Sequence, residues 1–219
     1  AKQDGKFIVT TKDGDVYEAK SVVVATGVPE MFLPSIPGIE NVDLYTNMSI
    51  EKEQYINKRV LVLGKGNSGF ETADDLVDVA SVINIASPHP VKFAWRSHYV
   101  CDLRAVNNNI LDTYQLKQQN ALINGLITNI QKTEKGTFKV QIGYSMANQE
   151  VEELEYDYVI ACTGFQVDKS IFDESCQPNY AIYNRFPDMT PYYESTNVRD
   201  LFFAGVLTQM RDFKKKQSG

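Results

Sequence analysis

The chain has 219 residues, of which 43% are hydrophobic and 23% charged, and its formal net charge is −6. This is the composition of a globular protein with length for one large domain or two small ones, and the acidic balance argues against nucleic acid or an anionic membrane as the main partner. No apolar run reaches the roughly 20 residues needed to cross a bilayer, and Cys101, Cys162 and Cys176 form neither a CxxC pair nor a metal-ligand spacing, which disfavours a dithiol relay and a metal site.

The chain opens with a unit that recurs further along. Residues 5–27 read GKFIVTTKDGDVYEAKSVVVATG, and residues 136–164 read GTFKVQIGYSMANQEVEELEYDYVIACTG. Each stretch predicts a strand, a turn or loop, a short strand, and an apolar strand that ends in Thr-Gly. Asp13-Gly14 predicts a hairpin turn in the first copy, and the second copy carries a longer loop around residues 146–149. Two copies predict two related dinucleotide-binding domains, each using the unit to return to its own sheet.

The last predicted strands of the two copies end alike, in Ala25-Thr26-Gly27 and in Cys162-Thr163-Gly164. A strand that stops at a small residue, a hydroxyl and a glycine lets a cofactor or an interdomain crossover pass close to the backbone. The alternative is a plain transition from strand to loop. Residues 200–205, DLFFAG, predict one more short strand that stops at a glycine, facing the first cofactor. We therefore expect cofactor-binding residues at these ends: Ala25, Thr26, Gly27, Thr163, Gly164 and Gly205.

A dinucleotide-binding fingerprint lies in residues 59–75, RVLVLGKGNSGFETADD. Residues 60–63 have the apolar, β-branched character of a strand that is buried on both faces of a parallel sheet. Gly64 permits the tight turn, Gly66 lets the backbone approach a pyrophosphate, and Gly69 lets the following helix pack against the strand. A glycine-rich turn without any ligand is the alternative interpretation.

The helix of the fingerprint is expected to begin near Asn67 and Ser68. Its free N–H groups and the positive end of its dipole attract phosphates, so both residues are candidate cofactor contacts. Its expected apolar face consists of Phe70, Ala73, Leu76, Val77 and Ala80.

The next strand, predicted over residues 82–86, is followed by the position that distinguishes NAD from NADP. An acidic residue there favours NAD and an arginine favours NADP, but the sequence reads Ser87-Pro88-His89-Pro90. His89 could bind a 2′-phosphate or be a surface-loop histidine. Arg96 could add charge to the same site or form a surface salt bridge.

Residues 98–117, HYVCDLRAVNNNILDTYQLK, are the densest polar group in the chain. One interpretation is an active-site or interdomain segment over the nicotinamide, and the other is a capped helix whose polar residues face water. No acid or base role is assigned to any residue here.

Together these elements predict an α/β protein. A Rossmann-like NAD(P)-binding domain is inserted in an FAD-binding Rossmann-like domain that is incomplete in this sequence. Residues 1–27 form the end of a β-meander in the outer domain, residues 28–156 the NAD(P)H-binding domain, and residues 157–219 the return segment of the outer domain.

On the strings GKGNSGFETA (64–73) and 98–117, the chain resembles the flavoproteins with two dinucleotide-binding domains, in the superfamily of the flavin-containing monooxygenases. It is more closely similar to the FAD-dependent oxidoreductases of the endoplasmic reticulum that are linked to degradation of misfolded proteins. The resemblance implies FAD in the outer domain and NADPH in the inserted one. It also implies hydride transfer from NADPH to FAD, then to an unknown small-molecule or protein acceptor, in the lumen of the endoplasmic reticulum rather than the cytoplasm.

The sequence departs from that superfamily in three places. No FAD fingerprint precedes Ala1, so we expect a piece of a longer enzyme that does not hold FAD tightly alone. Tyr45 and Ser49 stand where the monooxygenase motif has His and Tyr, and Val206 stands where Asp usually follows Gly205. Two other functions stay open: a monooxygenase acting on nitrogen, sulfur or a ketone (Baeyer–Villiger type), and a catalytically incomplete module that binds a nucleotide or a protein.

Overall fold

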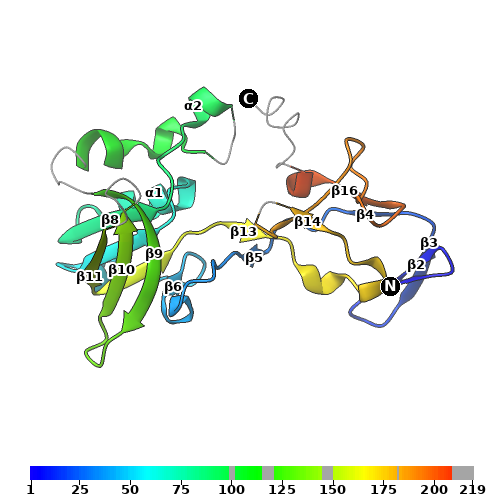
Figure 1. The fold of residues 1–219 in the computed structure, drawn as a ribbon, viewed down its shortest axis with the longest axis horizontal. Coiled ribbons are helices and arrows are strands. Elements are labelled where there is room, and N and C mark those ends of the chain that lie inside the picture. Colours follow the sequence, from blue (N-terminus) through cyan, green and yellow to red (C-terminus); the bar gives the residue numbers. More distant parts are fainter. Residues whose placement is uncertain (99–101, 115–120, 145–149, 182, 209–219) are drawn as a thin grey trace. The chain divides into compact units, whose positions relative to one another are not determined.

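The computed structural model describes residues 1–98, 102–114, 121–144, 150–181 and 183–208, which divide into two compact units (Figure 1). Of the described residues, the outer unit comprises 1–32 and those from 165 to 208, and the inserted unit comprises those from 33 to 164. The mixed α/β class predicted from the sequence is confirmed. Among the described residues, no helix is both long and apolar enough to span a membrane.

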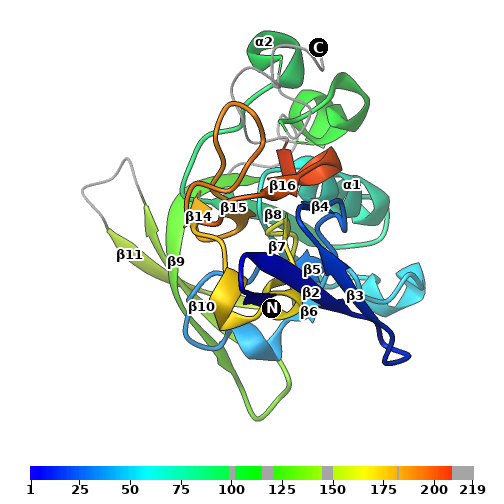
Figure 2. The same cartoon turned by 90° about the vertical axis from the view of Figure 1, so that its right-hand side faces the viewer.

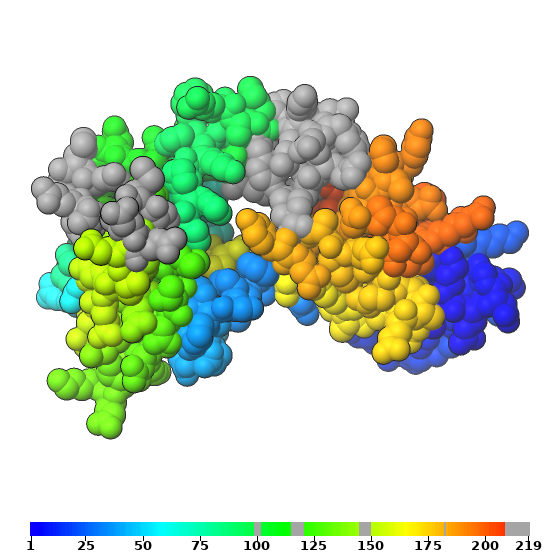
Figure 3. Space-filling view, viewed as in Figure 1, coloured from blue at the N-terminus to red at the C-terminus, as the bar shows by residue number. Residues whose placement is uncertain are grey.

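The inserted unit is built on a seven-stranded sheet with the order β11-β10-β9-β8-β7-β12-β6. Neighbouring strands from β6 to β9 run parallel, whereas β9, β10 and β11 form an antiparallel meander. The strands are β6 (Asp43–Leu44), β7 (Arg59–Leu63), β8 (Val82–Ser87), β9 (Leu122–Lys132), β10 (Phe138–Tyr144), β11 (Val151–Tyr156) and β12 (Tyr158–Ala161). Figure 3 shows the meander, in light green, on the surface of this unit.

Strand β7 is covered on both faces, as a parallel strand requires. Val60 and Val62 pack in one cluster with Phe70, Ala73 and Leu76 of the helix α1 (Asn67–Leu76). The alternate residues Leu61 and Leu63 pack in a second cluster with apolar side chains of the meander. The predicted fingerprint strand, the start of its helix and the strand that follows are therefore confirmed.

The fingerprint helix is shorter than predicted. It ends at Leu76, with Val77 as its C-cap residue, because the chain has to turn before β8 begins at Val82. Val77 and Ala80 lie in this turn, where they remain partly buried against the same core as the helix.

The outer unit combines a meander, β1 (Lys2–Gln3), β2 (Lys6–Thr10) and β3 (Val16–Ala19), with a parallel pair, β4 (Val22–Val24) and β16 (Leu201–Phe203). Figure 2 shows β2 and β3 side by side as a hairpin, whose turn at Asp13-Gly14 is confirmed by the Thr11–Asp15 backbone hydrogen bond. Two short antiparallel pairs complete the sheets: β5 (Glu30–Met31) with β13 (Phe165–Gln166), and β14 (Tyr180–Ala181) with β15 (Phe186–Pro187).

The remaining elements are short helices. They are η1 (Ile39–Asn41), η2 (Lys52–Tyr55), α2 (Ala94–Ser97), η3 (Ala105–Asn107), the π-helix η4 (Ile110–Tyr114), η5 (Lys169–Ile171), η6 (Glu174–Cys176) and η7 (Gly205–Thr208).

The structure corrects the two predicted boundaries. The predicted return at residue 157 lies too early, because β12 pairs in parallel with β7 and β6 inside the inserted sheet, and the unit extends to Gly164. The first crossing follows Phe32 rather than Gly27, because β5 still pairs with β13 in the outer unit. The repeat itself predicted this arrangement, since the last strand of each copy joins the parallel strands of its own unit. The loop at residues 146–149 lies outside the described residues.

Candidate functional site

Strands β7 and β8 of the inserted unit end at one level, beside the start of β9. The register pairs Leu63 with Ala86 and Ser87 with Asn124, so that Gly64, Ser87 and Asn124 follow one another across the carboxyl edge of β7 and β8. The amide of Gly64 extends the ladder by donating to the Ala86 carbonyl at 2.8 Å. The carboxyl edge of parallel strands is where α/β sheets bind ligands.

Glycine stands at the three fingerprint positions for different physical reasons. Gly64 has φ +116°, and a Cβ there would overlap the carbonyl of Cys162; a Cβ on Gly69 would overlap the carbonyl oxygen of Gly64. Packing of the protein therefore requires both. Gly66 has an ordinary extended backbone (φ −88°, ψ −176°), and a Cβ there would meet nothing within 4 Å. No atom of the described residues requires a glycine at Gly66, and this open space fits the close approach of a ligand.

The N-terminus of α1 points its first amides toward the same edge. Gly66 is the N-cap residue and offers no side-chain cap. The N–H groups of the first helical turn have no partner within a helix by its geometry, and they are donors suited to a phosphate. Asn67 and Ser68 begin this turn, as predicted.

The side chain of Asn67 binds the polar segment instead. Its Nδ2 donates to the Asp102 carbonyl at 2.9 Å, while its Oδ1 accepts from the Arg104 amide and from Asn107 Nδ2, both at 3.0 Å. The buried Asn107 also donates to Glu71 Oε1 at 3.0 Å. The segment is thus anchored to the fingerprint helix by its polar residues.

This arrangement corrects the interpretation of residues 98–117 as a helix whose polar side chains face water. Leu103 and Ile110 are fully buried in the core beneath α1, and the hydroxyl of Tyr114 accepts from the Ile83 amide at 3.0 Å. Residues 99–101 and 115–117 lie outside the described residues. A contact with the nicotinamide stays a prediction.

Lys65 is a functional candidate that the sequence analysis missed. Its Nζ donates to Asn124 Oδ1 at 2.5 Å and to the His89 carbonyl at 3.3 Å. Burial lowers the pKa of this ammonium to about 8. A lysine between the first two glycines of the fingerprint was the visible sign, but its neighbours come from later strands.

The residues predicted to read the ribose lie at the end of β8. Ser87 Oγ donates to the His89 carbonyl at 2.9 Å and accepts from the His89 amide at 3.3 Å, which forms a tight turn. Arg96 is exposed on α2. Cofactor contacts of these three side chains stay predictions.

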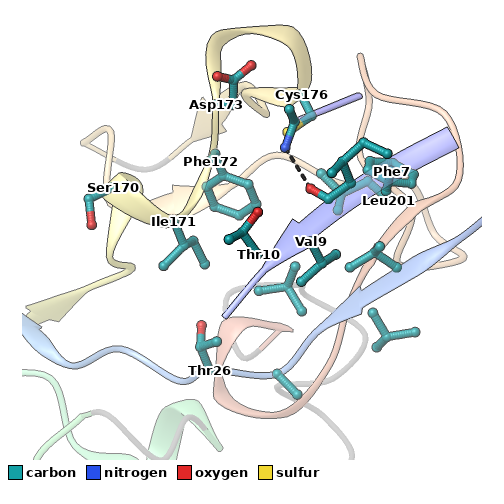
Figure 4. A pocket seen from close by; sticks show the side chains of 16 residues that line it. Phe7, Val9, Thr10, Thr26, Ser170, Ile171, Phe172, Asp173, Cys176 and Leu201 are labelled. Atoms are coloured by element: carbon teal, nitrogen blue, oxygen red, sulfur yellow. Dashed lines mark hydrogen bonds between the residues drawn. The ribbon is translucent and has the colours of Figure 1, made fainter. Parts of the chain in front are cut away.

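In the outer unit, residues 25–27 directly follow β4, and Gly205 follows β16, so these predicted residues meet at one edge of the parallel pair. Beside β4 lies an open cavity of about 700 Å³ (Figure 4). Its labelled lining includes Val9, Phe172 and Thr26. Thr163 and Gly164 are not part of this edge, because they follow β12 in the inserted unit, next to the contact of Gly64 with Cys162.

The described cysteines are buried thiols. Burial raises the pKa of Cys162 to about 11, and its Sγ lies 3.6 Å from the hydroxyl of Thr72. Cys176 is buried in the core of the outer unit. Cys101 lies outside the described residues, and the part of the chain that the structure describes contains no cluster of potential metal ligands.

Comparison with known proteins agrees with this fold. Residues 1–205 match the family model described as pyridine nucleotide-disulphide oxidoreductase. "FAD-dependent oxidoreductase domain-containing protein 2" of Mus musculus is 33% identical over 234 residues, which cover 97% of this chain and 35% of that protein. The chain therefore spans about a third of the length of this curated relative.

Two further similarities cover different shares of the chain. "Ferredoxin--NADP reductase 1" of Christiangramia forsetii is 35% identical over 89 residues, which cover 38% of this chain and 25% of that protein. The solved structure of a flavin-containing monooxygenase from Stenotrophomonas maltophilia has a TM-score of 0.68 at 20% identity, covering 99% of this chain and 64% of that one. At this identity, the solved structure shows the fold alone.

Proposed function

The chain belongs to the pyridine nucleotide-disulphide oxidoreductase family, and on this premise we propose that it is part of an NADPH-dependent flavoprotein oxidoreductase. The inserted unit binds NADPH, and the outer unit contributes to the FAD site. When bound, these cofactors supply hydride transfer from the nicotinamide to the flavin and then to an acceptor. The names of the relatives, which include FAD and NADP, support this choice of cofactors.

The observation that carries the proposal is the space at Gly66. Neither backbone strain nor a neighbouring atom requires a glycine there, so the absent side chain leaves room for a pyrophosphate against the backbone. The amides of Asn67 and Ser68 supply donors, and the dipole of α1 favours the negative charge. Ser87 lies at the strand end where a ribose is read.

In the outer unit, the end of β4 and the end of β16 would hold FAD. Thr26 and Gly27 leave the sheet beside Gly205, which brings two glycines to one carboxyl edge. Small residues at such an edge let a dinucleotide run along the backbone.

We propose no dithiol step within this chain, although the family description contains the word disulphide. A thiol acts as a nucleophile only as its thiolate, and burial keeps Cys162 protonated. Cys176 belongs to a different unit and is also buried. The acceptor therefore receives its electrons without these two thiols.

The test is an absorbance spectrum of the purified chain after incubation with FAD and gel filtration, followed by titration with NADPH. A retained flavin band that bleaches with NADPH alone supports the oxidoreductase. Oxidation of NADPH that depends on an added substrate and yields an oxygenated product indicates the monooxygenase instead. Saturable NADPH binding without retained flavin fits both a part of a longer flavoprotein and a nucleotide-binding module, which reduction of added free FAD by NADPH then separates, and binding of neither cofactor refutes the proposal.

A further inference from the structure

The ammonium of Lys65 lies beside the carboxyl end of β8 and the start of β9. Lys65 stands between Gly64 and Gly66, yet its Nζ reaches Asn124 on β9 and the carbonyl of His89 after β8. In a dinucleotide fold, the pyrophosphate lies at the helix N-terminus, whereas the residue after the second strand reads the adenosine ribose. The position of Nζ is therefore that of a ribose-reading group.

The charge of Lys65 has no counter-ion among the described residues. Both of its hydrogen-bond acceptors, an amide oxygen and a backbone carbonyl, are neutral, and none of the ion pairs within the described part of the chain includes it. Partial burial lowers its pKa to about 8 without an opposing contribution from any carboxylate. Burying a cation without an opposite charge beside it costs free energy, and an anionic ligand next to the ammonium would offset this cost.

The surroundings of Lys65 admit a phosphate. Residues 87–90, Ser-Pro-His-Pro, carry no carboxylate that would repel one. Asn124 is exposed, so a ligand can reach the ammonium from solvent and displace these neutral acceptors. A phosphate monoester gives an ammonium a charge-assisted hydrogen bond, which is stronger than the bonds it would replace.

We propose that Lys65 recognises the 2′-phosphate of NADP(H) and sets the preference of the inserted unit for NADP(H) over NAD(H). The inference rests on the proposed function, because it assigns a residue to the dinucleotide site proposed above. It replaces Arg96 by Lys65 as the principal cation of that site.

The competing explanation is that Lys65 only fastens the turn after β8 to β9. A fastening role would affect every nucleotide equally, whereas recognition of the 2′-phosphate affects only ligands that carry it. Two matched ligand pairs separate these outcomes: NADPH against NADH, and 2′,5′-ADP against 5′-AMP.

The experiment is calorimetric titration of the full chain and three variants with these four ligands. Lys65→Met is expected to weaken NADPH and 2′,5′-ADP roughly 10- to 100-fold, the loss typical of a hydrogen bond to a charged group. The affinities for NADH and 5′-AMP are expected to stay unchanged. Lys65→Arg is expected to keep the preference, and the control Lys139→Met, which breaks an exposed pair with Glu153, is expected to alter nothing.

Equal loss of all four ligands in Lys65→Met, together with a lower melting temperature, would overturn the inference in favour of the fastening role. A wild-type chain that binds NADH as tightly as NADPH would overturn the inference while leaving the dinucleotide site standing. A wild-type chain that binds neither would overturn both this inference and the proposed function.

Discussion

Substitution of Gly66 by alanine is expected to separate folding from binding. The backbone angles of Gly66 suit any L-residue, and the added methyl group would meet no atom within 4 Å. Alanine narrows the conformations of the unfolded chain, which stabilises the fold by about 0.4–1 kcal/mol, and it is a poorer N-cap residue than glycine by a similar amount, so the free energy of unfolding should change by less than about 1 kcal/mol. The folded protein should otherwise be unchanged.

Binding of NADPH should weaken. A phosphate oxygen that accepts from a backbone amide lies about 2.9 Å from the nitrogen, whereas a methyl carbon keeps other atoms about 3.5–4.0 Å away. The methyl group on residue 66 would therefore hold the pyrophosphate off the backbone. We expect the dissociation constant for NADPH to rise at least about tenfold, which corresponds to about 1.4 kcal/mol.

Gly69→Ala is the matched comparison. Its methyl group would overlap the carbonyl oxygen of Gly64, and such overpacking costs on the order of 1–3 kcal/mol of stability. Each kcal/mol lowers the melting temperature of a chain of this size by about 2–4 °C. Thermal unfolding and NADPH titration of both variants give the assay. If Gly66→Ala binds NADPH like the wild type, or unfolds as easily as Gly69→Ala, the assignment of that space to a ligand is refuted.

Three further predictions concern the surroundings of the site. Asn67→Ala should lower the free energy of unfolding by about 1–3 kcal/mol in urea denaturation, because it removes the acceptor of the Arg104 amide and of the buried Asn107 side chain; the exposed Asn109→Ala, measured alongside, should lose less, and equal losses would contradict the anchoring role. The affinity for NADPH relative to NADH should fall as pH rises through about 8, because the pKa of Lys65 lies there and the phosphate binds only the protonated ammonium; Lys65→Arg should remove this slope, whereas a slope that persists in that variant would contradict the assignment to Lys65. Alkylation of the folded chain at pH 8, followed by mass spectrometry, should leave Cys162 unmodified, since burial raises its pKa to about 11 and the thiolate is the reactive form; rapid labelling would contradict its burial.

The fingerprint was readable from the sequence because its parts are local. Residues 60–63 are apolar without interruption, and the glycines and the helical periodicity follow within a few positions. Such a run predicts a buried strand at any position in the sheet where both faces are covered. The boundary near residue 157 was misplaced because an apolar run does not show which sheet a strand joins. The apolar strand β12 could join the parallel strands of either unit.

Features that depend on distant partners were not readable. Lys65 donates a hydrogen bond to Asn124, which is 59 positions further along the chain. The polar composition of residues 102–107 is typical of a solvated helix. Only the fold brings Asn67 within hydrogen-bonding distance of these residues. Hydrogen bonds between residues so far apart leave no periodicity in either segment.

The antiparallel pairing of β5 with β13 sets Met31 directly opposite Phe165. The polypeptide thus leaves the outer unit and re-enters it through paired strands, so residues 33–164 are an inserted segment whose two ends are neighbours. Termini that lie close together allow one domain to be inserted into another, and lengthening such an inserted segment costs little closure entropy. The inserted unit is therefore suited to expression as an independent protein or to exchange for another domain, with a short linker joining Met31 to Phe165 in the outer unit that remains.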